Sequence, residues 1–182
     1  MKEGRADVVK IECGRNSDKT ISAIHNAGIP VIAHIGLTPQ SAGQLGGLKV
    51  QGKSVDAALR MIDDARSYEE AGAFAILMEC VPAEIARLVS ESLKVPTISY
   101  GAGPNCDCQG LVSADVLGMF DAFLPKFSRR YVDLGLEVSK AFSKYRDDVL
   151  AGHFPGEENC YGISAETVEE IEKLLAQKEK NT

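Results

Sequence analysis

The 182-residue sequence contains no tryptophan, and only 6% of its residues are aromatic. It also has no excess of positive charge, since 20 lysines and arginines are set against 26 aspartates and glutamates, a formal net charge of -6. Nucleic acids and anionic membranes favour basic partners, so we expect the protein to bind neither. No apolar run approaches the ~20 residues that cross a bilayer, and residues 1–7 lack the apolar core of a signal peptide. We therefore expect a cytoplasmic protein.

The cysteines are odd in number, and no secretion signal accompanies them. There are five: Cys13, Cys80, Cys106, Cys108 and Cys160. This pattern favours free thiols over disulfides. Cys106 and Cys108 could form a metal clip, but one intervening residue is not the usual zinc spacing and no second Cys/His pair accompanies them. We therefore do not expect a metal ion there.

What the sequence does contain is a regular alternation of short apolar segments and amphipathic ones. Five strands are predicted, at residues 8–12, 31–34, 75–79, 97–101 and 122–126. Room for one helix lies between most of them, which indicates βαβ units and a parallel sheet. Each intervening helix has one apolar stripe, a pattern that favours a barrel over a doubly wound sheet. In such barrels the chemistry lies where the strands end.

The predicted organisation is a single, partial barrel domain over residues 1–182, with a C-terminal helical region over 128–182. Residues 36–53 and 101–110 are rich in glycine and follow predicted strands, so both are predicted to be functional loops. The predicted helices cover 16–28, 54–71, the segment after Pro82, 113–119, 128–151 and 165–179.

Three polar side chains lie on the first two predicted strands. Lys10 and Glu12 are two residues apart on one strand and therefore project to the same side. They could form a substrate or metal site, or a structural ion pair that closes one end of a barrel. His34 ends the second strand and is equally compatible with a catalytic role and with a buried, hydrogen-bonded one.

Glu79 ends the third predicted strand, after four apolar residues. Burial disfavours the charged form of a carboxylate, which makes such a group a useful general base. On its position alone, a catalytic role and a structural one are about equally supported.

Longer motifs identify a family. Residues 34–41 and 46–52 together resemble ketopantoate hydroxymethyltransferase, and residues 9–12, 77–82, 101–103, 108–112, 125–127 and 154–155 agree with that family in the same order. The resemblance covers nearly all of residues 4–161.

This resemblance implies a (β/α)8 TIM barrel of the phosphoenolpyruvate/pyruvate superfamily that assembles as a homo-oligomer. It implies transfer of a one-carbon unit from 5,10-methylenetetrahydrofolate to 3-methyl-2-oxobutanoate, with Mg²⁺ stabilising an enolate of this 2-oxoacid. By the same resemblance, Glu79 is the general base, Lys10 and His34 contact the substrate, and Glu12 lies beside the metal, with a water molecule between them.

The resemblance also indicates what this chain lacks. Met1 precedes the family's fourth strand, so we expect only strands 4–8, without the two aspartates that bind Mg²⁺ directly. The chain could be a fragment, one part of a split enzyme, or a truncated, non-catalytic subunit. Because a partial barrel exposes its sheet edges, we expect it to associate with itself or with the missing N-terminal half. A carbon–carbon lyase of the same superfamily is a weaker alternative.

Overall fold

The computed structural model describes residues 3–14 and 16–179 of the chain. The chain divides into two units, Met1–Val132 and Asp133–Thr182. The first contains the sheet and all the predicted site residues, whereas the second is helical.

The first unit has an α/β fold built on one parallel sheet. Neighbours in the sheet follow the chain order, β1-β2-β3-β4-β5, and every pairing is parallel. A sheet whose strands follow the chain order without reversal is the arrangement found in a barrel, whereas a doubly wound sheet reverses its order. The strands are β1 (Val9–Glu12), β2 (Val31–Gly36), β3 (Ala75–Glu79), β4 (Thr97–Tyr100) and β5 (Cys108–Gln109).

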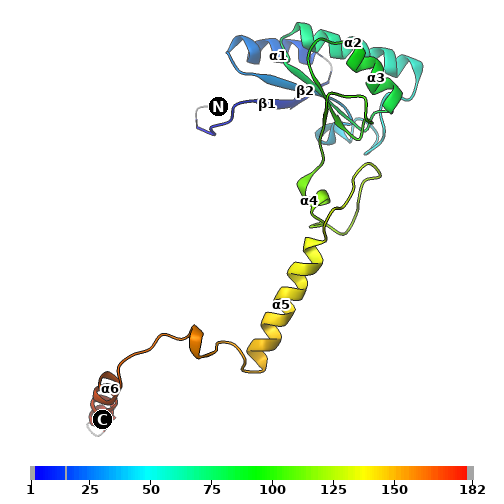
Figure 1. The fold of residues 1–182 in the computed structure, drawn as a ribbon. Coiled ribbons are helices and arrows are strands. Elements are labelled where there is room, and N and C mark those ends of the chain that lie inside the picture. Colours follow the sequence, from blue (N-terminus) through cyan, green and yellow to red (C-terminus); the bar gives the residue numbers. More distant parts are fainter. Residues whose placement is uncertain (1–2, 15, 180–182) are drawn as a thin grey trace. The chain divides into compact units, whose positions relative to one another are not determined.

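Three helices pack together along one face of this sheet (Figure 1). They are α1 (Ser17–Asn26), α2 (Val55–Glu70) and α3 (Ala83–Glu91). The N-cap of α2 is Ser54, whose hydroxyl accepts the N–H of Ala57 at 3.2 Å. The buried residues of these helices recur at helical spacing and meet alternate residues of the strands. This core comprises Ile21, Met61, Ala65, Tyr68, Ala86 and Val89 from the helices and Val31, Ala33, Ile35, Ile76 and Met78 from the strands.

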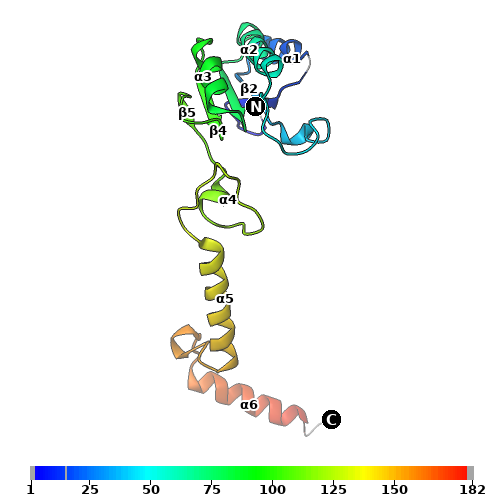
Figure 2. The same cartoon turned by 90° about the vertical axis from the view of Figure 1, so that its right-hand side faces the viewer.

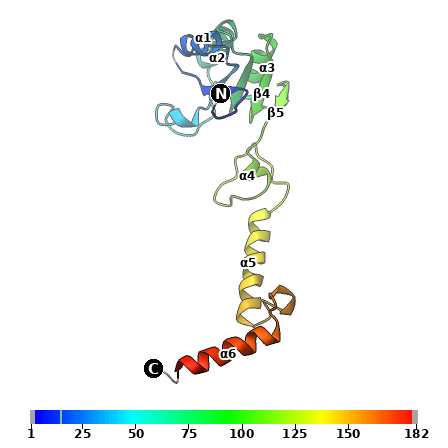
Figure 3. The same cartoon turned by 90° about the vertical axis from the view of Figure 1, so that its left-hand side faces the viewer.

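The opposite face of the sheet is not covered by α1, α2 or α3 (Figure 3). After β2 the chain enters a long segment that contains only a short 3₁₀ turn, η1 (Pro39–Ser41), before α2 begins. A short helix, α4 (Ser113–Val116), follows β5, and its buried Asp115 accepts the hydroxyl of Ser128 at 2.9 Å.

The second unit contains α5 (Leu134–Leu150), a short 3₁₀ turn η2 (Glu157–Asn159) and α6 (Ala165–Glu179). Asp133 is the N-cap of α5, and its side chain accepts the N–H of Leu136. No residue of α5 is buried. Its exposed apolar side chains include Phe142, which is 70% exposed, and Leu150, which is 79% exposed.

The predicted strand at 122–126 is wrong, and the sheet takes a different fifth strand. Residues 122–126 form no strand; Phe123 is 65% exposed and Pro125 has no N–H to donate to a ladder. The fifth strand is β5, which lies beside β4 within the segment predicted to be a loop (Figure 2). The helix predicted at 128–151 begins only at Leu134, and the helix predicted at 113–119 ends at Val116.

No helix in the part of the chain that the structure describes combines the length and the apolar character needed to cross a bilayer.

Asp107 holds β5 against the start of β4. Its Oδ2 accepts the N–H of Thr97 at 2.7 Å and the Thr97 hydroxyl at 2.8 Å. These hydrogen bonds, the backbone one above all, lower the pKa of Asp107 below its usual value of 3.8. The folded state therefore binds this proton less readily than the unfolded chain does. The resulting stabilisation is present above about pH 4 and is lost as the pH falls through the lower, folded value.

Asp107→Asn is therefore expected to lower the free energy of unfolding by about 1 kcal/mol at pH 7, less than a buried hydrogen bond to a charged group contributes, because Asp107 is exposed and solvent screens its charge. The difference between variant and wild type should shrink toward pH 3 and below. Urea unfolding at pH 7 and at pH 3 measures it, with Asp7→Asn as a control on an exposed carboxylate of the same unit. An equal difference at both pH values would contradict the assignment.

Candidate functional site

The four site residues predicted from the sequence lie on one face of the sheet. Glu12 pairs with His34 across β1 and β2, and Glu79 pairs with Gly36, two residues beyond His34. Paired residues of neighbouring parallel strands project to the same side, as do residues two apart along a strand. Lys10, Glu12, His34 and Glu79 therefore share the face that α1, α2 and α3 leave uncovered. All but Lys10 stand at or near the carboxyl ends of their strands.

His34 and Glu79 are in direct proximity. The His34 Nε2 lies 3.3 Å from Oε2 of Glu79, with the His34 side chain 1% exposed and that of Glu79 20% exposed. The pair is within ion-pair distance but outside hydrogen-bond geometry, and neither ring nitrogen of His34 has a hydrogen-bond partner among the described residues. A buried imidazole with unused hydrogen-bonding capacity beside a carboxylate is the arrangement expected of a polar binding site.

Glu12 is tied to the long segment between β2 and α2. Its Oε2 accepts the N–H of Gln40 at 2.9 Å. Lys10 lies two residues earlier on the same strand and is exposed. The two side chains therefore bring one positive and one negative charge to the face that also carries Glu79. No ion pair between Lys10 and Glu12 is found among the described residues, so the structural ion-pair interpretation gains no support.

Tyr100 is a further residue of this face that sequence reasoning missed. It pairs with Glu79 in the register of β3 and β4, and it is half-buried. Its ring lies so close to Gly110 that a Cβ on that glycine would overlap it. The available signal was the place of Tyr100 near the end of the strand predicted at 97–101, where the pleat puts it on the side opposite Ser99.

These residues do not by themselves form a magnesium site. Within residues 3–14 and 16–179, no group of three or more His, Cys, Asp or Glu side chains is arranged to hold a metal ion. Mg²⁺ requires near-octahedral oxygen coordination. The two carboxylates of this face, Glu12 and Glu79, cannot supply that many oxygen ligands. The described residues therefore do not form a complete binding site for Mg²⁺. All five cysteines are free thiols, including Cys106 and Cys108.

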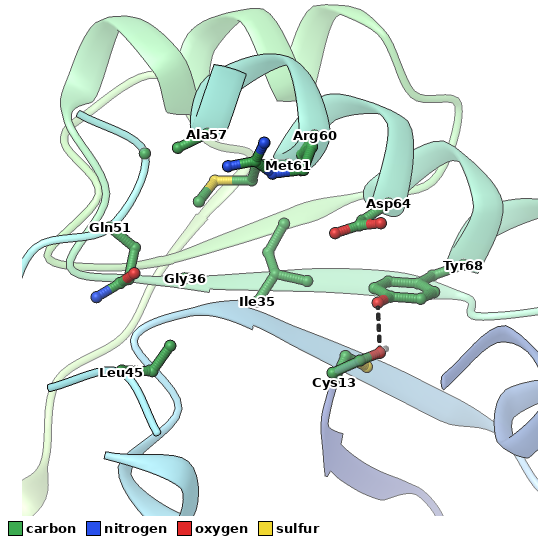
Figure 4. A pocket seen from close by; sticks show the side chains of 12 residues that line it. Cys13, Ile35, Gly36, Leu45, Gln51, Ala57, Arg60, Met61, Asp64 and Tyr68 are labelled. Carbon is green, nitrogen blue, oxygen red and sulfur yellow. Dashed lines mark hydrogen bonds between the residues drawn. The ribbon is translucent and has the colours of Figure 1, made fainter. Parts of the chain in front are cut away.

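A cavity of about 440 Å³ lies on the other side of β2, between the sheet and α2. Arg60, Asp64 and Tyr68 project from α2 toward it, and Ile35 lies beneath (Figure 4). The Tyr68 hydroxyl donates to the carbonyl oxygen of Gly14 at 3.1 Å.

The cavity's chemistry differs from that of the Glu79 face. Burial raises the pKa of the Cys13 thiol to about 11 and also raises that of the Tyr68 hydroxyl. Both groups are therefore protonated at neutral pH, and Cys13 is a poor nucleophile. The candidate active site is consequently the opposite face, where His34 and Glu79 meet.

Comparison with known proteins points to one family. A family model described as ketopantoate hydroxymethyltransferase matches residues 1–157. The chain is 50% identical over 171 residues to a protein of Enterococcus faecalis named 3-methyl-2-oxobutanoate hydroxymethyltransferase, covering 94% of this chain and 62% of that protein. A protein of the same name from Moorella thermoacetica is 52% identical over 161 residues, covering 88% of this chain and 60% of that protein.

A third relative of that name, from Syntrophobacter fumaroxidans, is 49% identical over 164 residues, covering 90% of this chain and 58% of that protein. The chain thus spans about three fifths of the length of the curated relatives it matches.

Proposed function

The chain belongs to the ketopantoate hydroxymethyltransferase family, and on that basis we propose that it provides the base-bearing part of the active site of such an enzyme. The reaction is transfer of a hydroxymethyl group from 5,10-methylenetetrahydrofolate to 3-methyl-2-oxobutanoate, which gives 2-dehydropantoate for pantothenate synthesis. The observation that carries the proposal is the 3.3 Å approach of His34 Nε2 to Oε2 of Glu79 on the open face of the sheet.

Glu79 acts as the general base in this proposal. Its carboxylate removes the proton from C3 of the 2-oxoacid, and the electron pair of that C–H bond enters the enolate. The buried His34 ring orients the Glu79 carboxylate and offers a nitrogen to a substrate oxygen. Water breaks the two C–N bonds of the folate methylene, so that the carbon leaves as formaldehyde and the two protons of the water go to the tetrahydrofolate nitrogens. The enolate carbon then forms a bond to the formaldehyde carbon, and the resulting alkoxide takes the proton that Glu79 had removed.

Lys10 offsets the negative charge that develops on the enolate oxygen. A fixed positive charge beside a developing oxyanion stabilises the transition state more than the ground state. Its place on β1, on the same face as Glu79, supports this role.

Mg²⁺ would polarise the keto group when bound. The described residues do not complete a site for it, so no step is assigned to the ion. Glu12 is proposed to lie beside the metal only indirectly, through water, because its carboxylate also accepts the N–H of Gln40.

We also propose that the five strands form part of a (β/α)8 barrel of the phosphoenolpyruvate/pyruvate superfamily and correspond to its strands 4–8, with β5 as the eighth. The sequential, parallel strand order supports this, as does the share of the relatives' length that the chain spans. The uncovered face and the exposed apolar residues of α5 support association with the missing strands, with further copies of the chain, or with both. We place the protein in the cytoplasm.

The experiment that tests the function supplies the chain with both substrates and Mg²⁺ and follows 2-dehydropantoate by mass spectrometry. It is run with and without a separately produced polypeptide that carries the remaining two fifths of the Enterococcus faecalis relative. Product that forms only with both polypeptides present supports a shared active site. Absence of product in every mixture that co-purifies as a complex would overturn the catalytic proposal and favour the alternative, a non-catalytic subunit of the full-length enzyme.

A further inference from the structure

The backbone on either side of the Glu79–Cys80 peptide is held from three directions. The Glu79 carbonyl accepts the N–H of Leu37 at 2.8 Å, and the Cys80 N–H donates to the carbonyl of Tyr100 at 2.9 Å. The Cys80 carbonyl accepts the N–H of Gln51, also at 2.9 Å. Three separate segments, the end of β2, the end of β4 and the segment before α2, therefore fix this one turn.

The turn requires an unusual conformation of Cys80. Its φ is +50°, in the left-handed region that residues with a Cβ rarely adopt. Such a residue persists only where the surrounding structure over-determines its backbone, and such residues concentrate at functional sites. Here the over-determination is visible in the hydrogen bonds to Tyr100 and Gln51.

Gly36 permits the close approach on the β2 side. Its φ is +89°, and a Cβ built on it would overlap the Glu79 carbonyl oxygen and lie 2.7 Å from Cγ2 of Val81. Only a residue without a side chain lets β2 reach the backbone of Glu79 this closely.

The thiol of Cys80 does not explain the residue's position. Burial, together with the nearby negative charge of Glu79, raises the pKa of the Cys80 thiol. The sulfur is consequently protonated at neutral pH and is a weak nucleophile. What distinguishes Cys80 is its backbone, not its sulfur.

We propose that Cys80 is a positioning residue of the site, whose left-handed backbone, held by Leu37, Tyr100 and Gln51, directs the Glu79 carboxylate toward His34. Without the turn, β3 would continue as an extended strand and its carbonyl would no longer meet the Gln51 N–H. The inference builds on the proposed role of Glu79 as the base, but the geometry it describes can be tested without turnover.

The same geometry couples the base to the segment between β2 and α2. That segment contacts Glu12 through the N–H of Gln40 and Cys80 through the N–H of Gln51. It therefore bridges β1 and β3 at the carboxyl ends of the strands.

The test is a graded series at one position: Cys80→Gly, Cys80→Ala and Cys80→Val. Glycine adopts the left-handed region freely, alanine less readily, and a β-branched residue least of all. The readout is the ¹⁵N shift of the His34 ring and its response to Glu79→Gln in each background. We expect the response to be the same in wild type and Cys80→Gly, and to fall about twofold or more in Cys80→Val, with Cys80→Ala between them.

Cys13→Val is the matched control, because Cys13 also directly follows a strand but is not among the residues with positive φ. It should leave the His34 response unchanged. Circular dichroism verifies that each variant folds. If Cys80→Val does not fold, the comparison of the other two variants tests the proposal, with a larger His34 response expected in Cys80→Gly than in Cys80→Ala. A full response in folded Cys80→Val, an equal loss in Cys80→Gly, or no response to Glu79→Gln in wild type would each overturn the proposal.

Exchange of the substrate's C3 proton separates the two proposals. In a complex active in exchange, Cys80→Val should lower kcat about tenfold or more with KM nearly unchanged, because the base is misdirected while binding persists. Cys80→Gly should stay within about twofold of wild type in the same assay. If the His34 response behaves as expected while Glu79→Gln leaves exchange unaffected, the positioning by Cys80 stands and the role of Glu79 as the base fails.

Discussion

Glu79→Gln is expected to slow exchange of the C3 proton of 3-methyl-2-oxobutanoate by about 100-fold or more, because general bases contribute about 10²- to 10⁴-fold to such steps. Glutamine has nearly the same shape as glutamate but cannot accept the proton. Loss of the C3–H signal in D₂O, followed by ¹H NMR with Mg²⁺ present, measures the rate directly. The assay uses the chain together with whichever partner polypeptide gives activity.

The control for this prediction is Glu91→Gln. Glu91 is an exposed glutamate of α3 whose Oε1 lies 2.7 Å from a guanidinium nitrogen of Arg87, and it has no role in the proposed chemistry. It should leave exchange unchanged, and its effect on stability should be within about 1 kcal/mol, as for other surface ion pairs. Exchange by Glu79→Gln at the wild-type rate would remove Glu79 from the role of base.

Much of the fold of the first unit follows from local sequence. Predicted strands at 31–34 and 75–79 agree with β2 and β3, because continuous apolar runs bounded by glycine and polar residues are typical of buried parallel strands. The helix predicted at 54–71 agrees closely with α2, whose N-cap at Ser54 and apolar stripe are both visible in the sequence. The pleat then placed Lys10 and Glu12 on one side.

The fifth strand could not be predicted in the same way. Residues 122–126 have an apolar pattern, but a strand needs a neighbour with which to exchange hydrogen bonds, and that depends on distant segments. β5 is only two residues long, and a hydrogen bond from buried Thr97 to Asp107 helps to hold it in place. No local pattern reports such a contact.

The site likewise combines features that local sequence predicts with features that depend on distant segments. Glu12, His34 and Glu79 were predicted because each ends a predicted strand, but the distance between His34 and Glu79 depends on the register of β2 against β3. The left-handed Cys80 was not predicted, because cysteine has no preference for that conformation. Glycine does, so Gly36 could have been singled out as a position of close approach.

Gly36→Ala and Gly28→Ala form a pair that isolates this close approach. Both glycines have a positive φ, +89° for Gly36 and +77° for Gly28. They differ in what an added Cβ would meet: no heavy atom lies within 4 Å at Gly28, whereas at Gly36 the Glu79 backbone and the side chain of Val81 are in the way. The conformational penalty is therefore common to both variants and the steric one is not.

Gly28→Ala is expected to lower the free energy of unfolding by about 1 kcal/mol, the penalty for a Cβ at positive φ. Gly36→Ala should lower it by about 2–4 kcal/mol, because forcing β2 away from Glu79 adds the penalty of overpacking. Urea unfolding followed by circular dichroism measures the free energy of unfolding of both variants. Both substitutions lie in the first unit, so the signal of the second unit is common to the two and cancels in the comparison. Equal losses would show that β2 relaxes freely at this point. In that case the hydrogen bond from Leu37 to the Glu79 carbonyl could not hold the base in place.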